Sequence, residues 1–217
     1  MKTKTLVLAA AALTACALTA SAQSNVYSLN IVGYVNAAIS NNYTLVANPL
    51  DNGSGNSMTN LIPATALPNG SKVLLWTGSG YQTIAKKAGA WPLSPAIAPG
   101  TGYFVYNNAG GVLTNTYVGN VPGSVPGSLT NNLPVGYQLV GTPYPIGGNI
   151  QGTGSNSINL PSLLPNGSKV LKWTGSGYQT LAKKAGAWPS ATVNVGEGYF
   201  IYNATNIVVP WTQDVGP

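Results

Sequence analysis

The amino-acid sequence predicts an all-β protein made of two tandem copies of one small antiparallel sandwich or barrel, preceded by a signal peptide. Charged residues make up only 6% of the 217 residues, while 27 glycines and 16 prolines divide the chain into short apolar runs. This composition is typical of many short strands joined by turns. In addition, a block of 26 residues occurs twice, at 67–92 and 164–189, with only two differences.

The repeated block predicts a β-hairpin. Ser71–Trp76 and Tyr81–Lys87 are strand-forming runs on either side of residues 77–80, Thr-Gly-Ser-Gly, and glycine adopts the positive φ angles of a turn without steric cost. Two period-two apolar runs around such a turn are a strong hairpin signal. The second copy predicts the same hairpin at Ser168–Trp173 and Tyr178–Lys184.

One difference between the copies bears on which face of the hairpin is buried. Side chains alternate between the two faces of a strand, so Leu74 and Trp76 share one face while Val73 and Leu75 share the other. Lys172 takes the place of Leu75 in the second copy. We therefore expect the Leu74/Trp76 face to be the core face.

Residues 1–22 have the pattern of a secretory signal peptide. Lys2 and Lys4 supply a basic start, Thr5–Leu18 is an apolar core, and Ala20-Ser21-Ala22 is a small-residue cleavage site. The apolar core is too short for a transmembrane span. We expect a secreted protein that is extracellular or attached to the cell surface.

Cys16 gives an alternative to plain secretion. Residues 13–16, Leu-Thr-Ala-Cys, resemble a bacterial lipobox, whose cysteine is lipidated and becomes the new N-terminus. The apolar run continues past Cys16, which favours cleavage after Ala22. In that case the mature protein contains no cysteine and therefore no disulfide.

The rest of the chain divides into two repeats and a linker. We predict the first β-repeat at 26–118, a Pro/Gly/Ser-rich linker at 119–132 and the second β-repeat at 133–217. The strands expected outside the hairpins are, in order, 26–39 with a break at Gly33, Tyr43–Ala47, Tyr103–Asn107, Val112–Val118, Gly136–Val140, Tyr199–Asn203 and Ile207–Thr212, with a helical turn or irregular cover in Leu61–Leu67.

Composition argues against several functions. Without residues 1–22 the chain keeps seven lysines and three acids, a net charge of +4, and it contains no arginine or histidine. Nucleic-acid recognition usually uses arginine, so we expect no nucleic-acid partner. Metal sites usually need clusters of His, Cys or carboxylates, so no metal and no cofactor are predicted.

The acids also fail to form a catalytic set in the sequence. Asp51 and Glu197 lie in different repeats, and Glu197 stands where the first repeat has Thr101, so neither repeat has its own carboxylate pair. Asp51 is expected to form a turn, with assistance to a Ca²⁺ site as the alternative. No Ser/His/Asp or Cys/His set exists, and no serine is marked as activated by lysine. We expect no enzymatic activity.

Three motifs recur in the same order in both repeats. The first is a strand that ends in proline, at 43–49 and 136–143. The second is a W-x-G-x-G-Y hairpin, and the third is a G-x-G-Y-F strand at 99–105 and 195–201. Together they resemble an uncharacterised β-module that occurs in tandem in bacterial secreted and surface proteins. The resemblance covers nearly the whole mature chain and implies an extracellular β-module with no assigned activity and no catalytic residues.

Paired aromatic residues are candidates for a ligand site. Trp and Tyr combine a large apolar face with a polar tip, which suits stacking on sugar rings. Core packing and cross-strand pairing are the alternative, which we favour for Trp76 and Trp173. The candidate ligand-binding residues of this class, including two glutamines that can add hydrogen bonds, are Trp91, Trp188, Tyr81, Tyr178, Gln82 and Gln179.

Two lysine pairs are the only charge clusters. Lys86-Lys87 and Lys183-Lys184 fit a solvated pair that protects a sheet edge, or a contact with an anionic glycan or cell envelope. Identity of the two copies at exposed positions motivates the second hypothesis, although recent duplication also explains it. If both copies bind a ligand, tethering raises avidity.

From these features we expect a secreted, non-catalytic structural or adhesive protein of the bacterial cell surface or extracellular matrix. The alternative is a bivalent carbohydrate-binding module that uses exposed Trp and Tyr. Its expected partners are extracellular polysaccharide, other surface proteins or further copies of the chain.

Overall fold

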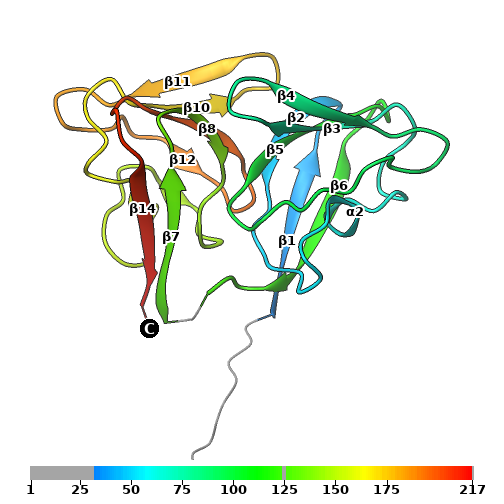
Figure 1. The fold of residues 1–217 in the computed structure, drawn as a ribbon, viewed down its shortest axis with the longest axis horizontal. Coiled ribbons are helices and arrows are strands. Elements are labelled where there is room, and N and C mark those ends of the chain that lie inside the picture. Colours follow the sequence, from blue (N-terminus) through cyan, green and yellow to red (C-terminus); the bar gives the residue numbers. More distant parts are fainter. Residues whose placement is uncertain (1–31, 124–125, 217) are drawn as a thin grey trace, which may run out of the picture.

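The computed structural model describes residues 32–123 and 126–216, so the predicted signal peptide and Cys16 lie outside the described residues. The described chain is all-β apart from one short helix and forms two similar antiparallel assemblies, as the sequence predicted. Figure 1 shows the two repeats side by side, with a two-stranded ribbon running down from each, β7–β14 at left and β1–β6 at right. No helix in the described ranges is long and apolar enough to cross a membrane.

The first repeat combines a four-stranded sheet with a two-stranded ribbon. The sheet has the strand order β2-β5-β3-β4, all antiparallel, and the ribbon is β1-β6. The elements are β1 Val32–Ile39, β2 Asn42–Ala47, α2 Met58–Leu61, β3 Lys72–Trp76, β4 Tyr81–Ala85, β5 Gly102–Asn107 and β6 Leu113–Asn120.

The second repeat has the same plan. Its sheet has the order β8-β13-β10-β11, its ribbon is β7-β14, and a short pair, β9-β12, is added. The elements are β7 Gly127–Leu133, β8 Gly136–Val140, β9 Gly148–Asn149, β10 Lys169–Trp173, β11 Tyr178–Ala182, β12 Thr192–Val193, β13 Tyr199–Asn203 and β14 Val209–Val215.

A buried asparagine ties each sheet to its ribbon in the same way. In the first repeat, Nδ2 of Asn107 donates to the carbonyl of Ile39 at 3.1 Å. In the second, Nδ2 of Asn203 donates to the carbonyl of Leu133 at 3.0 Å. These equivalent hydrogen bonds show that β1 and β7 are equivalent strands, so each repeat begins with the first strand of its ribbon.

The predicted linker at 119–132 is therefore largely wrong. Residues 127–133 form β7, which pairs with β14 along its whole length, from Gly127 with Val215 to Leu133 with Val209. One face of the ribbon is exposed, so Ser, Thr and Asn alternate along it and give the strand the composition of a linker. Only residues 121–126 join the last strand of the first repeat to the first strand of the second.

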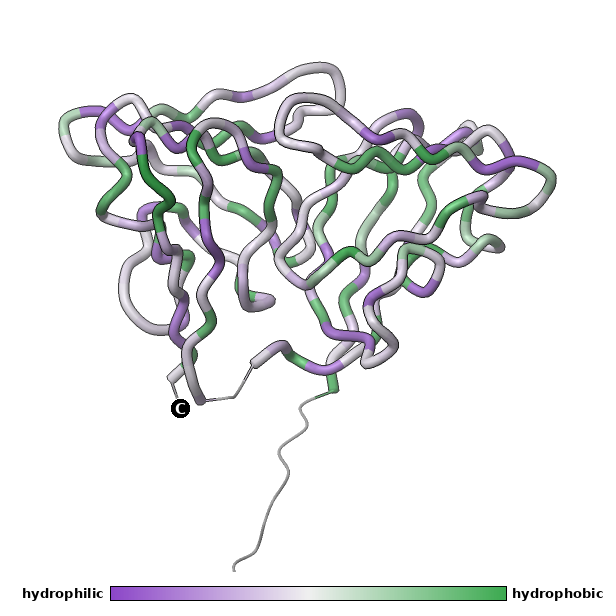
Figure 2. Tube along the Cα trace, in the orientation of Figure 1, coloured by the Kyte–Doolittle hydropathy of each residue, from purple (hydrophilic) through white to green (hydrophobic). Residues whose placement is uncertain are grey.

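Each repeat has its own hydrophobic core between the sheet and the ribbon, and Figure 2 shows hydrophobic stretches along the strands of both repeats. The hairpin contributes Val73, with none of its surface exposed, and Ile84 to the first core, while Leu75 packs against it. The expected core face was therefore wrong, because the Val73 face covers the main core. The Leu74/Trp76 face packs against a separate cluster shared with the other repeat.

Lys172 is accommodated on this core face because it has an ion-pair partner. Its Nζ lies 3.1 Å from Oε1 of Glu197, and both side chains are about four-fifths buried. In the first repeat the equivalent positions are Leu75 and Thr101. The two substitutions form a matched pair, which satisfies a charge that would be costly alone.

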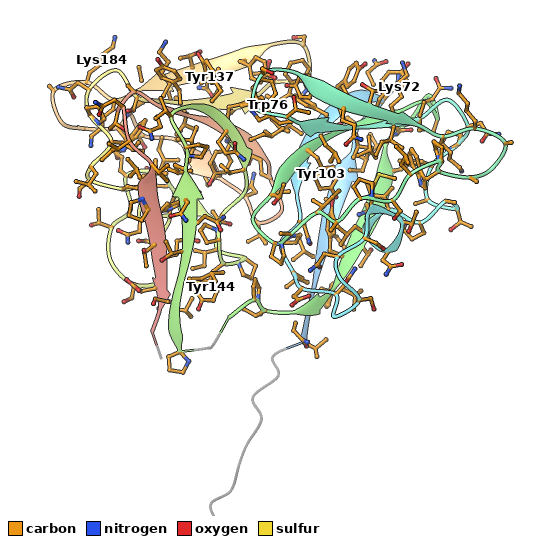
Figure 3. The ribbon with its side chains drawn as sticks, viewed as in Figure 1. Lys72, Trp76, Tyr103, Tyr137, Tyr144 and Lys184 are labelled. Carbon is orange, nitrogen blue, oxygen red and sulfur yellow. The ribbon has the colours of Figure 1, made fainter. Side chains whose placement is uncertain are left out.

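Buried tyrosines lie at the sheet–ribbon contact. The hydroxyls of Tyr103 and Tyr117 are 2.7 Å apart in the first core, and Figure 3 shows Tyr103 inside the repeat. The second repeat has Tyr199 at the place of Tyr103, but Gln213 at the place of Tyr117. The Tyr199 hydroxyl is buried and has no hydrogen-bond partner among the described residues.

Raising the pH above about 10 is expected to destabilise the fold. Burial raises the pKa of Tyr117 to about 12 and raises the pKa values of Tyr103 and Tyr199 well above 10. The unfolded chain loses these protons from about pH 10 upward, so the stabilisation is complete below pH 10 and is lost as the pH rises toward about 12.

Guanidinium unfolding at several pH values from about 8 to about 12 would measure this loss, which for Tyr117 alone amounts to about 2–3 kcal/mol. Tyr117→Phe is expected to make the decline shallower. A stability independent of pH over this range would contradict the prediction.

Candidate functional site

The two repeats meet through the outer faces of their sheets. Four side chains form a shared hydrophobic cluster, here called the junction cluster: Leu45 and Phe104 from the first repeat, and Leu139 and Phe200 from the second. Each is 4% exposed or less. The cluster is separate from the two main cores, so both faces of each sheet are covered over this region.

A tryptophan from each repeat crosses the junction. Nε1 of Trp76 donates to the carbonyl of Tyr137 at 3.0 Å, and Nε1 of Trp173 donates to the carbonyl of Tyr43 at 2.9 Å. Tyr43 and Tyr137 are equivalent residues of β2 and β8. The two bonds are thus reciprocal, and Figure 3 shows Trp76 and Tyr137 near each other at the top of the molecule.

The tryptophan rings also contact the phenylalanines of the opposite repeat. Trp76 lies edge-on to Phe200 with 5.1 Å between ring centroids, and Trp173 lies edge-on to Phe104 at 5.3 Å. Edge-to-face pairs of this kind contribute about 0.5–1.5 kcal/mol beyond the burial of area. The aromatic contacts are therefore as reciprocal as the hydrogen bonds.

Backbone contacts complete the junction. The amide of Ala47 donates to the carbonyl of Gly196, and the equivalent amide of Gly141 donates to the carbonyl of Gly100, both at 2.9 Å. Each bond joins the end of the first sheet strand, β2 or β8, to the glycine turn that leads into the Y-F strand of the other repeat. The two repeats thereby bind each other through equivalent surfaces, the arrangement of a symmetric dimer.

The glycines of the G-x-G motif have separate roles at this junction. Gly100 and Gly196 have a φ of +76°, the left-handed region that favours glycine. Gly102 and Gly198 approach the other repeat closely, and a Cβ on Gly102 would lie 2.9 Å from the Val140 carbonyl oxygen. The motif therefore combines a turn with a contact surface.

Beside the junction cluster the aromatic residues enclose an open hollow, here called the aromatic groove. It has a volume of about 190 Å³. Three of its tyrosines are partly exposed, Tyr81 and Tyr137 at 39% and Tyr178 at 40%. The groove is lined by Trp76, Tyr81, Tyr137, Leu171, Tyr178 and Phe200, which come from both repeats.

The structure thus brings Tyr81 and Tyr178 together in one groove, although the sequence analysis expected them in two separate sites. Partial burial, together with the Tyr178 hydroxyl, raises the pKa of Tyr81, and burial raises the pKa of Tyr178. Both hydroxyls stay protonated at neutral pH, and they interact with each other at the groove. Each tyrosine is the last residue of the W-x-G-x-G-Y motif of its repeat.

Trp91 and Trp188 are not platforms for a ligand. Each is only 8% exposed and belongs to the main core of its repeat. Nε1 of Trp91 donates to the carbonyl of Ile62 at 3.1 Å. The neighbouring proline suggested an exposed loop, but the ring turns inward, where its N–H has a backbone partner.

Gln82 and Gln179 are exposed but do not lie with the tyrosines that precede them. Successive residues of a strand point to opposite faces. Gln82 follows Tyr81 in β4, so it points to the face away from the groove; Gln179 follows Tyr178 in β11 in the same way. Neither glutamine lines the aromatic groove.

The two lysines of each pair have different positions. Lys86 and Lys183 are buried, and their ammonium groups donate to backbone carbonyls: Lys86 to Ala64 and Leu67, and Lys183 to Ser162 and Leu164. They stabilise the loop that precedes the hairpin. The prediction that each lysine pair is solvated was therefore wrong for Lys86 and Lys183.

Lys87 and Lys184 are exposed. Figure 3 shows Lys184 at the outer end of the second repeat. A side-chain hydrogen bond fixes the loop that carries each lysine. Oδ1 of Asn69 accepts a hydrogen bond from the amide of Gly89, and Oδ1 of Asn166 accepts one from the amide of Gly186, both at 2.8 Å. Folding thus accounts for part of the identity between the copies.

Two acids of the described chain, Asp51 and Glu197, have structural partners. Oδ1 of Asp51 accepts the amide of Gly53 at 3.0 Å, a turn contact, and also Nδ2 of Asn56 at 3.0 Å. Glu197 holds Lys172 and accepts the amide of Asn194 at 2.9 Å. Across residues 32–123 and 126–216, no three His, Cys, Asp or Glu residues gather into a group that could hold a metal ion.

Comparison of the chain with protein-family models, with curated proteins and with solved structures finds no match. The three recurrent motifs are therefore interpreted from their geometry alone. Each motif supplies one part of the junction: the first strand gives the carbonyl acceptor, the hairpin gives the tryptophan donor, and the G-x-G-Y-F strand gives the close approach.

Replacing the first or the second lysine of a pair is expected to lower the stability of the fold by very different amounts. Lys86→Met removes the donor to the carbonyls of Ala64 and Leu67 and should lower the free energy of unfolding by about 2 kcal/mol. Lys87→Met, its exposed neighbour, should change it by less than about 0.5 kcal/mol. Urea unfolding of the two variants would measure the difference, and equal effects would contradict the assignment.

Proposed function

We propose that the protein is a secreted, non-catalytic structural or adhesive protein of the bacterial cell surface or extracellular matrix. The observation that carries the proposal is the reciprocal junction, which holds two equivalent repeats in one body. Each repeat presents the same lysine-bearing loop to solvent. A body with two equivalent contact sites gains avidity for a repetitive surface without further contacts.

Charge supports an anionic partner for these loops. Lys87 and Lys184 are exposed, and neither takes part in an ion pair within the described part of the chain. The predicted signal peptide would place the protein outside the cytoplasm, where envelope and matrix polymers are often anionic. Attraction between exposed charges is screened by salt, over about 8–10 Å at physiological ionic strength.

The test is sedimentation of the purified mature chain with envelope and matrix material from its native host. Binding is expected to weaken as salt rises from about 0.05 M to about 0.5 M. Lys87→Ser together with Lys184→Ser should weaken it by about tenfold, because both contact sites lose their charge. Failure of the unmodified chain to sediment would overturn the proposal.

The matched control for this experiment is Thr83→Ser with Thr180→Ser, at exposed positions of the same hairpins. These changes keep charge and fold, so they should leave sedimentation unchanged. An equal loss in the control and in the lysine variant would show that the lysines are not the contact.

The aromatic groove favours a second candidate function, recognition of carbohydrate. Three partly exposed tyrosines beside Trp76 offer apolar faces with hydroxyl groups at their edges. Such surfaces suit pyranose rings, which present apolar faces and polar rims. The groove is lined by residues of both repeats, so this site lies between the repeats, in place of the two separate sites expected from Trp91 and Trp188.

A glycan array decides whether the groove binds sugar. Tyr81→Ala with Tyr178→Ala should reduce any glycan signal by at least about tenfold, because both stacking faces are lost. Thr83→Ala with Thr180→Ala, on the same strand face as these tyrosines, should leave the signal unchanged. Silence over neutral and acidic glycans, or binding indifferent to the tyrosine change, would exclude this candidate.

A further inference from the structure

We propose that copies of this chain exchange repeats through the junction, so that the first repeat of one molecule docks on the second repeat of another. The product is a swapped dimer, or a longer chain of molecules, held by the same contacts that close the single molecule. Exchange would give the structural protein proposed above a way to join its own copies, and this inference rests on that proposed function.

The junction is suited to exchange because each repeat carries both halves of every contact. The first repeat presents the Trp76 donor and the Tyr43 acceptor, and the second presents the Trp173 donor and the Tyr137 acceptor. The apolar part is also the same on both sides, a leucine and a phenylalanine from each repeat. A repeat from another molecule therefore offers the same surface as the repeat of its own chain.

One difference between the repeats selects which pairs can form. Ala47 and Gly141 are equivalent residues that face each other across the junction, and a Cβ added to Gly141 would collide with the Cβ of Ala47. Two first repeats would bring two alanines to this place and could not approach as closely. The geometry thus disfavours a pair of two first repeats, whereas the pair of a first and a second repeat, which exchange requires, fits as it does in the single molecule.

The covalent connection sets the concentration at which exchange competes with closure. Only residues 121–126 join the repeats. A short connection gives the internal partner an effective concentration on the order of millimolar. Exchange should therefore appear when the protein folds at concentrations near that value, and at crowded cell surfaces, while dilute protein stays closed.

A disulfide placed across the junction reports which molecule supplies each repeat. Thr101 and Val140 form an antiparallel bridge between the repeats, and paired residues of this kind lie about 4.5–5.5 Å apart, within the range that a disulfide spans. One chain carries Thr101→Cys and a second carries Val140→Cys, both with Cys16→Ser. In closed molecules these two positions meet only within one chain, so the single variants have no disulfide partner.

The two variants are mixed in guanidinium, refolded together at about 10 µM or about 1 mM, which lies near the effective concentration, and oxidised. Non-reducing denaturing electrophoresis then counts disulfide-linked dimers. Exchange predicts a dimer fraction at least about tenfold higher at the higher concentration and no dimer from either variant refolded alone. Absence of mixed dimers at both concentrations, or equal dimers from the single variants, would overturn the proposal.

Gly141→Ala tests the selection step, and a chain with both cysteines isolates the exchange from the adhesive role. With Gly141→Ala the disulfide across the junction should form at least about fivefold less, in mixed dimers and in the double-cysteine chain alike, because the collision with Ala47 then affects the junction of every molecule; an unchanged yield would refute the steric selection. The double-cysteine chain with Cys16→Ser, oxidised when dilute, is locked closed. Its sedimentation with envelope material measures adhesion in the absence of exchange.

Discussion

A reciprocal pair of indole–carbonyl hydrogen bonds is the contact on which the arrangement of this molecule depends. Trp76 and Trp173 each reach from one repeat to the first sheet strand of the other, and each ring packs against the opposite phenylalanine. Because both sheets already cover a core on their inner faces, the outer faces would expose a row of aromatic side chains. Docking the repeats against each other buries the centre of that row and leaves its edge as the aromatic groove.

Much of the secondary structure could be predicted because the strand signals are local. Period-two runs and glycine turns located both hairpins and most sheet strands. The strand at 127–133 was missed because its polar residues lie on the exposed face of a ribbon, so composition alone resembles a linker. The core face of the hairpin was assigned wrongly because Lys172 looked incompatible with burial, while its partner, Glu197, lies 25 residues away in sequence and only the fold brings them together.

The candidate site was less predictable than the fold, since it depends on contacts between repeats. In the sequence, Tyr81 and Tyr178 are aromatic candidates of separate repeats, and the structure places them in one groove. Trp91 turned inward, which a proline-flanked position does not reveal. One signal was present in the sequence: Lys172 and Glu197 are charged where the first repeat has the uncharged Leu75 and Thr101, and opposite charges that appear together in one repeat suggest a spatial pair.

The differences between the repeats show how a duplicated chain becomes asymmetric without losing a symmetric contact. Donor, acceptor and junction cluster keep their residue types, so the docking energy is retained. Gly141 lies opposite Ala47, and a methyl group at Gly141 would collide with the Cβ of Ala47. Two first repeats, each with an alanine at this position, would therefore fit together less closely. A single glycine thus allows the close approach of a first and a second repeat, while two first repeats would collide at this place. Such a preference directs a tandem chain to close on itself when dilute and to join its neighbours when crowded.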